Sequence, residues 1–256
     1  MDTSQLFSLK GRTALITGGS RGIGRMIAAG FLAQGARVYI SARKAEACNQ
    51  TAKELSAFGS CFSLPADVST VQGAQALAAT YAQHENQLDI LVNNAGAAWG
   101  ADFDEFPESG WDKVVDLNLK APFFLTQALK PLLAKAGKTQ LAKVINIASI
   151  DGIAVNPMET YSYAASKAGL IHLTKRMATH LIKHRIVCTA IAPGAFASEM
   201  NRQARDHADE VSARIPAGRI GADEDMAGTA IFLASRAGDY VVGQTLAVDG
   251  GVTLGR

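Results

Sequence analysis

The chain has 256 residues, 48% of them hydrophobic, which is enough for a substantial core within one α/β domain. Lysine and arginine number 25 against 23 aspartates and glutamates, so the formal net charge is +2. Because no basic cluster stands out, the composition argues against a nucleic-acid partner and against attachment to a membrane surface.

The cysteines and the amino terminus favour a protein of the reducing cytoplasm. Cys48, Cys61 and Cys188 are far apart and have neither zinc-ligand nor CxxC spacing, so we expect buried, reduced thiols. Residues 1–12 contain no long apolar run behind a basic start, which argues against a signal peptide. No stretch approaches the roughly 20 apolar residues that a membrane helix needs.

Short apolar runs alternate along the chain with longer segments of helical period. The predicted strands are Thr13–Thr17, Arg37–Ala42, Cys61–Pro65, Asp89–Val92, Lys143–Ala148, Ile186–Ile191 and Gln244–Val248. The predicted helices are Gly22–Gln34, Lys44–Phe58, Val71–Glu85, Gly110–Leu133, Tyr161–Lys183 and Glu224–Ala234. The strands lack polar alternation, which is typical of strands buried on both faces. We therefore expect one domain, residues 1–256, with a doubly wound parallel sheet of seven strands and helices on both faces.

The first predicted strand leads directly into a glycine-rich turn, and a helix follows. The turn reads Thr17-Gly18-Gly19-Ser20-Arg21-Gly22-Ile23-Gly24. A dinucleotide needs its pyrophosphate close to the N–H groups of a helix amino terminus, and Gly18, Gly22 and Gly24 leave room for that approach. The placement of the turn between a strand and a helix, rather than the glycines alone, predicts a dinucleotide site.

The end of the second strand distinguishes NAD from NADP. NAD sites usually offer a carboxylate there, whereas this chain has Arg43 and Lys44 and no acid until Glu46. Arg43 and Arg21 would pair with a 2′-phosphate, which favours NADP(H). The alternative is that Arg43 and Lys44 only begin an exposed helix.

Two further polar residues follow strands at the edge where the cofactor is expected. Asp67 would accept a hydrogen bond from the adenine amino group, or would cap a helix. Asn94 follows the fourth strand, where polar groups would line the cofactor cleft.

Catalytic chemistry is predicted at the helix after the fifth strand. Tyr163 and Lys167 share one helix face, and Ser149 follows the strand itself. Reduction of a ketone leaves an alkoxide that needs a proton; a free phenol has a pKa of about 10, and a nearby ammonium would lower it. Ser149 would hydrogen-bond the substrate oxygen. Asn118 lies in the helical region after the fourth strand and is equally well explained as a polar residue in a helix.

Three other features offer weaker hypotheses. His180 and His184 are at helical spacing, but without a third ligand we expect a solvated helix face rather than a metal site. No Gly-x-Ser-x-Gly nucleophile elbow occurs. Residues 195–222 are charged and irregular, and they form either a substrate lid or a solvated surface loop.

These residues, in this order, resemble the short-chain dehydrogenase/reductase family from about residue 8 to residue 252. The matching pieces are the Thr17–Gly24 turn, Asp67-Val68, Asn93–Gly96, Asn118, Ser149, Tyr163 with Lys167, Pro193-Gly194 and Asp249-Gly250-Gly251. The resemblance implies a Rossmann fold and an NADP(H)-dependent oxidoreductase.

The resemblance also implies roles for individual residues. Tyr163 would be the general acid in reduction, and Lys167 would bind the nicotinamide ribose and lower the tyrosine pKa. Ser149 would position the carbonyl, and Asn118 would anchor a water in a proton relay. The implied cofactor site comprises Gly18, Ser20, Arg21, Gly22, Ile23, Gly24, Arg43, Asp67, Val68, Asn94, Ala95, Gly96, Tyr163, Lys167, Pro193, Gly194, Phe196 and Ser198.

The sequence departs from the family pattern at two places. Ser149 and Tyr163 are 14 residues apart where 13 is commonest, and we place the extra residue near Asn156–Glu159. Tyr161 has no lysine four residues on, so Tyr163 is preferred. Ser198 stands where the family usually has threonine, and its hydroxyl would keep the carboxamide contact.

Within the family, the chain looks most like NADPH-dependent β-ketoacyl reductases, in particular the bacterial branch linked to rhamnolipid synthesis. The shared pieces are the Ser41–Cys48 segment, Trp99-Gly100, Gly110-Trp111 and Tyr161-x-Tyr163. This likeness implies reduction of a 3-oxoacyl thioester in fatty acid metabolism. The resemblance to the family as a whole implies a homotetramer, with residues 243–251 packed between subunits.

Other interpretations stay open. An NADP-dependent sugar, polyol or other secondary-alcohol dehydrogenase would use the same residues. A catalytically silent NADP-binding sensor or scaffold would not need Ser149, Tyr163 and Lys167 together. An acidic acyl carrier protein or coenzyme A would be attracted by basic residues that are otherwise ordinary surface charge: Lys183, Arg185, Arg202, Arg205, Arg214 and Arg219.

Overall fold

A computed structural model of the chain describes residue 3 and residues 5–255. Its strands are β1 (Thr13–Thr17), β2 (Arg37–Ser41), β3 (Cys61–Ser63), β4 (Ile90–Asn93), β5 (Ala142–Ile147), β6 (Ile186–Pro193) and β7 (Thr245–Val248). They pair in parallel in the order β3-β2-β1-β4-β5-β6-β7. The prediction of a seven-stranded, doubly wound parallel sheet is confirmed, and each strand end lies within two residues of its predicted position.

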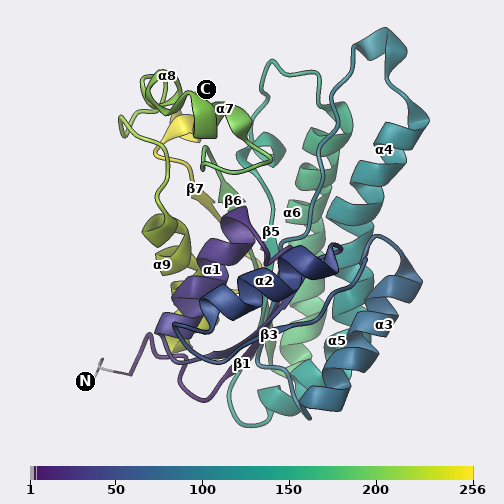
Figure 1. Cartoon of the computed structure of the whole chain (residues 1–256), viewed down its shortest axis with the longest axis vertical. Coiled ribbons are helices and arrows are strands. Elements are labelled where there is room, and N and C mark those ends of the chain that lie inside the picture. Colours follow the sequence, from purple (N-terminus) through teal and green to yellow (C-terminus); the bar gives the residue numbers. More distant parts are fainter. Residues whose placement is uncertain (1–2, 4, 256) are drawn as a thin grey trace.

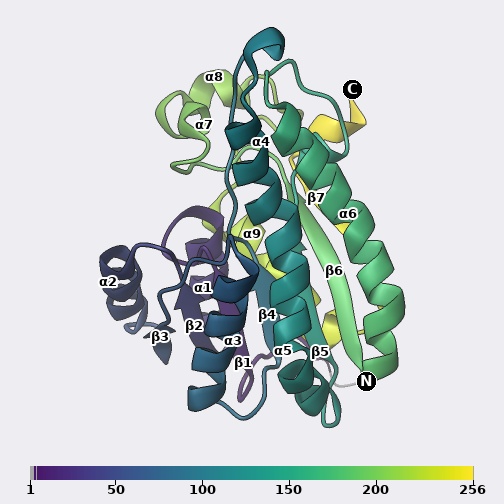
Figure 2. The ribbon, with the colours of Figure 1, turned by 90° about the vertical axis from the view of Figure 1, so that its right-hand side faces the viewer.

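Helices cover both faces of this sheet (Figures 1 and 2). They are α1 (Gly22–Ala33), α2 (Ala45–Leu55), α3 (Val71–His84), α4 (Glu108–Val115), α5 (Ala121–Gly137), α6 (Tyr161–Leu181), α7 (Arg202–Asp206), α8 (Ala208–Ser212) and α9 (Asp223–Ala234). The two short helices α7 and α8 stand at the top of both views.

The alternation of side chains along the strands divides the core between the two faces. Ala14 and Ile16 of β1 pack in one buried cluster with residues of α1, α2 and α9, including Phe31. Leu15, between them, packs in a second cluster with residues of α3, α5 and α6, including Leu129. Successive strand residues point to opposite faces, so strands apolar throughout require helices on both sides.

The sheet order places a ligand crevice at a definite edge. The chain winds outward from β1 through β2 to β3, then returns so that β4 pairs on the other side of β1. In doubly wound folds, ligands bind beyond the carboxyl ends of the strands at this reversal. The turn after β1 and the residues after β4 lie at this edge.

Two predicted elements differ in the structure. The single helix expected at Gly110–Leu133 consists of α4, a π-helical turn at Asp116–Lys120, and α5. The irregular region 195–222 contains α7 and α8. Hydrophobic periodicity does not distinguish an α-helix from one with a π turn inserted, because the apolar face continues through it.

Several expectations about composition can also be compared with the structure. Cys48, Cys61 and Cys188 are buried, free thiols, as predicted. No helix among the described residues combines the length and the apolar character needed to cross a membrane. In the same part of the chain, no group of three or more histidine, cysteine or carboxylate side chains is arranged to hold a metal ion.

Candidate active site

The glycine-rich turn after β1 is shaped by close approaches that side chains would prevent. Gly18 and Gly22 have φ angles of +65° and +52°, which L side chains rarely adopt. A Cβ on Gly18 would lie 2.7 Å from Nδ2 of Asn94, and one on Gly24 would press against the carbonyl of Gly18. The turn therefore leaves backbone N–H groups open at the amino terminus of α1. These residues fit the pyrophosphate of a dinucleotide.

The Asn94 side chain holds this turn in place. Its Nδ2 donates to the carbonyls of Thr17, at 2.9 Å, and Gly18, at 3.1 Å. The Thr17 hydroxyl accepts the backbone N–H groups of Asn94 and Ala95, both at 3.0 Å. The Nδ2 amide is thus bound to the turn itself, and a contact between Asn94 and the cofactor stays a prediction. Asn94 is a positioning residue that joins the end of β4 to the end of β1.

The two arginines predicted to contact a 2′-phosphate are exposed. Arg21 is the N-cap residue of α1, and Arg43 follows β2. Asp67 accepts the backbone N–H of Ser69 at 3.0 Å, and this bond, with a smaller effect of Arg43, lowers the pKa of its carboxyl group. Asp67 does not cap α3, whose cap is Thr70. Asp67 and Arg43 thus lie close enough to interact at the edge where the adenosine is expected.

Ser149 is positioned by the turn that follows β5. Its hydroxyl accepts the N–H of Asp151 at 3.1 Å. The turn packs directly on α6, since a Cβ on Gly152 would lie 2.6 Å from the carbonyl carbon of Lys167. A side-chain hydrogen bond between Ser149 and Tyr163 lowers the tyrosine pKa. The structure thus brings together the serine, tyrosine and lysine that the sequence predicted, despite the spacing of 14.

The ionisation of this group differs from the expectation. Burial raises the pKa of Tyr163 to about 12, more than the hydrogen bond with Ser149 lowers it. Burial also lowers the pKa of Lys167, which is 4% exposed, to about 8. The Lys167 ammonium donates to the Ile147 carbonyl at 2.7 Å and lies 5.6 Å from the centre of the Tyr163 ring. The predicted lowering of the tyrosine pKa is therefore wrong for these side chains, and Tyr163 is a neutral phenol near pH 7.

Asn118 lies in the π-helical turn and is 1% exposed. Its Oδ1 accepts the N–H of Ala97 at 2.8 Å, while Nδ2 donates to the Ala97 carbonyl at 2.9 Å and to Ser166 Oγ at 3.1 Å. A Cβ on Gly96 would lie 3.2 Å from Asn118 Oδ1 and 3.8 Å from Lys167 Nζ. The carboxamide therefore fixes the strand-end loop against α6, and π turns of this kind often mark functional sites.

The segment after β6 crosses the site and returns. Phe196 is buried and forms a β-bridge with Gly221, and the Gly221 N–H donates to the Ala195 carbonyl at 2.9 Å. Ser198 lies against the glycine turn, 3.2 Å from where a Cβ on Gly22 would be. Both ends of the predicted lid are thus fixed, with α7 and α8 between them.

Two other residues of the predicted cofactor site lie near the ends of strands. Val68 is buried in the segment that follows β3, and Pro193 is the last residue of β6.

A pocket of about 330 Å³ lies under the return of this segment. Its lining includes Phe196, Ile215 and Arg219 on one side and the turn Asp249-Gly250-Gly251 on the other. The Ala217 N–H donates to the Gly250 carbonyl at 3.0 Å, so the segment is joined to the carboxyl-terminal turn as well.

The basic residues considered as contacts for an acyl carrier protein or coenzyme A do not cluster at the site. Arg205 pairs with Glu199 and Asp206, and Arg219 pairs with Asp225. Lys183 and Arg185 follow the carboxyl end of α6, which begins at the catalytic edge and has 21 residues. At 1.5 Å per residue they lie about 30 Å from that edge. Arg202 and Arg214, in the same 195–222 segment, are exposed and take no part in these ion pairs.

Sequence reasoning missed three residues that organise the site. Thr17 ties the turn to β4, and Ser166 accepts from Asn118 while donating to the Tyr163 carbonyl at 2.8 Å. Gly152 permits the contact between the Ser149 turn and α6. Thr17 and Ser166 each adjoin a predicted site residue, Gly18 and Lys167, and no sequence signal marked Gly152.

Comparison with known proteins gives a consistent result. The family model described as enoyl-(acyl carrier protein) reductase matches residues 18–253. The rhamnolipids biosynthesis 3-oxoacyl-[acyl-carrier-protein] reductase of Pseudomonas aeruginosa is 48% identical over 252 residues, covering 97% of this chain and 98% of that protein. The 2-dehydro-3-deoxy-D-gluconate 5-dehydrogenase of Dickeya dadantii is 41% identical over 253 residues and covers 96% of both chains.

A solved structure also matches. The RhlG/NADP active-site complex of Pseudomonas aeruginosa superposes with a TM-score of 0.94, at 47% identity, over 97% of this chain and 99% of that one. The glycine turn, the serine, tyrosine and lysine around the α6 start, and these matches agree. The chain belongs to the short-chain dehydrogenase/reductase family and is an oxidoreductase that uses NADP.

Proposed function

We propose that the protein reduces the ketone of a 3-oxoacyl thioester to the corresponding 3-hydroxyacyl thioester. The observation that carries the substrate class is the 48% identity, over nearly the whole of both chains, with a 3-oxoacyl reductase. The chemistry itself rests on the juxtaposition of Ser149, Tyr163 and Lys167 at the edge that holds the glycine turn.

In this proposal each side chain has a defined task. NADPH, when bound against Gly18, Gly22 and Gly24, supplies the hydride. Ser149 donates a hydrogen bond to the ketone oxygen and aligns it with Tyr163. Tyr163, a protonated phenol whose pKa burial raises to about 12, gives its proton to that oxygen as negative charge develops. Lys167 offers a buried ammonium beside the tyrosine ring to the ribose hydroxyls.

The remaining contacts and the assembly belong to the same proposal. The segment 195–222 is a lid over the substrate, with Phe196 fixing its near end. Arg202 and Arg214 are the lid arginines available to an acidic acyl carrier protein or to coenzyme A. The edge strand β7 pairs with β6 on one side only, which supports its packing between subunits of a homotetramer.

A second candidate is oxidation of a sugar acid. The 41% identity with a 2-dehydro-3-deoxy-D-gluconate 5-dehydrogenase favours it, and the same three side chains would act in the reverse direction. The two candidates differ in the substrate that the surroundings of the site accept.

A substrate panel tests the proposal. We expect NADPH oxidation with acetoacetyl thioesters to have a kcat/KM at least tenfold above that with a keto sugar acid. Tyr163→Phe should lower kcat by about 10²–10⁴ for the thioester, the usual effect of losing a general acid. The variant should still bind NADPH, which a change in NADPH fluorescence on addition of the protein would show. Retained turnover in Tyr163→Phe would remove Tyr163 from the chemistry, and a preference for the sugar acid would favour the second candidate.

A further inference from the structure

The turn that follows β7 is closed by the side chain of its first residue. Asp249 Oδ1 accepts the N–H of Gly251 at 2.9 Å, while Oδ2 accepts the N–H of Thr253 at 2.8 Å and its hydroxyl at 2.7 Å. Gly250 and Gly251 have φ angles of +63° and +92°, which L side chains rarely adopt. We call residues 249–253 the aspartate turn.

The Asp249 carboxylate carries a negative charge in this turn. Burial raises the pKa of the carboxyl group, but the hydrogen bonds from Thr253 and Gly251 together lower it by more. The group is therefore ionised near neutral pH, and the three hydrogen bonds that it accepts are charge-assisted. Such bonds are stronger than those between neutral groups, so the turn is held firmly by one side chain.

The aspartate turn packs closely against the end of β6. The Gly194 N–H donates to the Val248 carbonyl at 2.9 Å, and a Cβ on Gly194 would lie 2.7 Å from Cα of Asp249. Gly194 directly follows β6 and leads into the segment 195–222. The beginning of that segment is therefore fixed against the first residue of the turn.

The same turn also holds the part of the segment that returns from α8. The Gly250 carbonyl accepts the Ala217 N–H at 3.0 Å. A Cβ on Gly250 would lie 2.7 Å from Cγ2 of Ile215, and one on Gly251 would lie 3.3 Å from Cβ of Pro216. The two glycines thus let the returning chain touch the backbone of the turn.

Beside these contacts, a hollow separates the returning chain from the end of β7. The pocket of about 330 Å³ is lined by residues of 215–221 on one side and of 247–251 on the other. The walls of a hollow make no dispersion contact with each other. The next fixed point is the bridge between Gly221 and Phe196. The contacts at the aspartate turn therefore fix residues 215–217 more than packing across the pocket does.

The segment held in this way borders the cofactor crevice. Ser198 lies against the glycine-rich turn, 3.2 Å from where a Cβ on Gly22 would be, and its hydroxyl accepts the Asn201 N–H at 3.0 Å. The segment therefore touches the glycine-rich turn near its beginning and the aspartate turn on its return. A shift at the second contact would move α7 and α8 relative to the crevice.

We propose that Asp249 and Thr253 are positioning residues, which hold the segment 195–222 where it completes the site for NADPH and substrate. They act through Gly194 and residues 215–217 and not by contact with the reacting atoms. For the substrate, the proposal rests on the carbonyl reduction and the lid proposed above. For NADPH, it rests on the contacts just described.

Two threonines give a matched pair of variants. Thr253→Val removes the hydroxyl bonded to Asp249, whereas Thr245→Val removes from β7 a hydroxyl with no hydrogen-bond partner among the described residues. Thr253→Ser keeps the hydroxyl and is the conservative variant. Asp249→Asn has one amide oxygen where the carboxylate uses two, so it loses the bonds of one oxygen.

Trypsin cleavage after Arg214 measures how firmly the turn holds the returning chain, because the bond leads into the buried Ile215 and is cut only when the chain is released. With NADPH bound, cleavage should be about tenfold or more faster in Thr253→Val and Asp249→Asn, as for loss of a hydrogen bond to a charged group. Thr245→Val and Thr253→Ser should be cleaved at the wild-type rate. Urea unfolding of the two valine variants should give equal midpoints, which separates local release from general loss of stability.

Binding gives the second measurement. In Thr253→Val, the Kd for NADPH and the KM for acetoacetyl-N-acetylcysteamine should each rise about fivefold or more, with a smaller change in kcat. Equal cleavage rates in Thr253→Val and Thr245→Val would overturn the hold of the turn on the segment. Faster cleavage with an unchanged Kd for NADPH would remove its role in the site. If the wild type does not reduce the thioester, the proposed reaction fails, while cleavage and the Kd for NADPH still decide the role of the turn.

Discussion

At the scale of single residues, the buried ammonium of Lys167 has a consequence for pH dependence. Burial lowers the pKa of Lys167 from 10.5 to about 8. If the ammonium must be protonated to donate to the ribose, kcat/KM for NADPH should fall as the pH rises through about 8, since this parameter reports the free enzyme. The guanidinium of the Lys167→Arg variant stays charged at every accessible pH. We therefore expect this variant to have a lower kcat/KM for NADPH that does not fall further as the pH rises through about 8.

The same group affects stability in the opposite direction. Between pH 8 and 10.5 the unfolded chain holds more protons at Lys167 than the folded chain does, so this residue makes folding more favourable as the pH rises. Activity and this contribution to stability should therefore change in opposite senses over that window. If kcat/KM for NADPH falls at the same alkaline pH in the wild type and in Lys167→Arg, a group other than Lys167 causes the fall.

Arg43 is the residue that we expect to set cofactor preference. A charge-assisted pair with a 2′-phosphate stabilises by about 1.5–3 kcal/mol, so Arg43→Asp should shift the NADPH to NADH ratio of kcat/KM by at least about tenfold towards NADH. Lys44→Asp, with the same charge change at the next exposed position, is the matched control and should shift the ratio far less. Equal shifts in both variants would indicate a general field effect instead of a direct contact.

At the scale of elements, the strands could be predicted from sequence because a strand buried on both faces is a short, uniformly apolar run. The helix across Gly110–Leu133 could not be divided correctly, because the π turn at Asp116–Lys120 depends on the bonds from Asn118 to Ala97, far away in sequence. The segment 195–222 has no apolar period long enough to reveal α7 and α8, each of five residues.

The candidate site also has features that could be predicted from the sequence and features that could not. The residue types and their order along the chain indicated where Ser149, Tyr163 and Lys167 would meet. The direction of a side chain was not predictable: the Asn94 amide binds the carbonyls of the glycine turn, a contact that the sequence did not indicate. The Tyr163 pKa depends on burial and on where the Lys167 ammonium points, neither of which is encoded by spacing.

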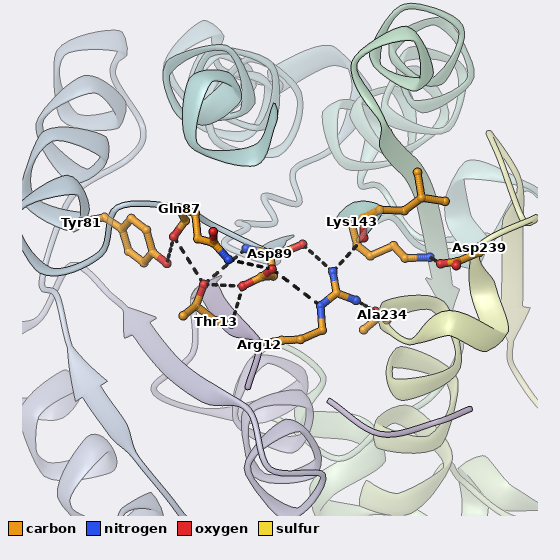
Figure 3. A network of polar contacts seen from close by, with 9 residues as sticks. Arg12, Thr13, Tyr81, Gln87, Asp89, Lys143, Ala234 and Asp239 are labelled. Atoms are coloured by element: carbon orange, nitrogen blue, oxygen red, sulfur yellow. Dashed lines mark hydrogen bonds and ion pairs between the residues drawn. The ribbon is translucent and has the colours of Figure 1, made fainter. Parts of the chain in front are cut away.

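At the scale of the whole molecule, the sheet has a second polar centre, at the amino-terminal ends of its strands and thus at the edge opposite the candidate active site. Figure 3 shows the contacts of this centre. The Arg12 guanidinium, 4% exposed, donates to the carbonyls of Ala234 at 2.6 Å, Leu141 at 2.8 Å and Asp89 at 3.2 Å. The Asp89 carboxylate accepts both the N–H and the hydroxyl of Thr13 at 2.9 Å. One side chain thus connects the amino-terminal ends of β1, β4 and β5 to the end of α9.

This centre should stabilise the fold without entering the chemistry. Arg12→Met leaves three buried carbonyls and the Asp89 carboxylate without their cation, a change that typically costs about 3–5 kcal/mol. The control is Arg37→Met, which removes a 2.7 Å ion pair between Glu85 and a half-exposed arginine, and should cost only about 0–1 kcal/mol. Urea unfolding measures both losses, while kcat per folded enzyme should stay at the wild-type value in each variant because the catalytic edge is unaltered. If the two variants unfold at the same urea midpoint, the guanidinium does not hold the four elements together, and the apolar clusters on the two faces fix their positions alone.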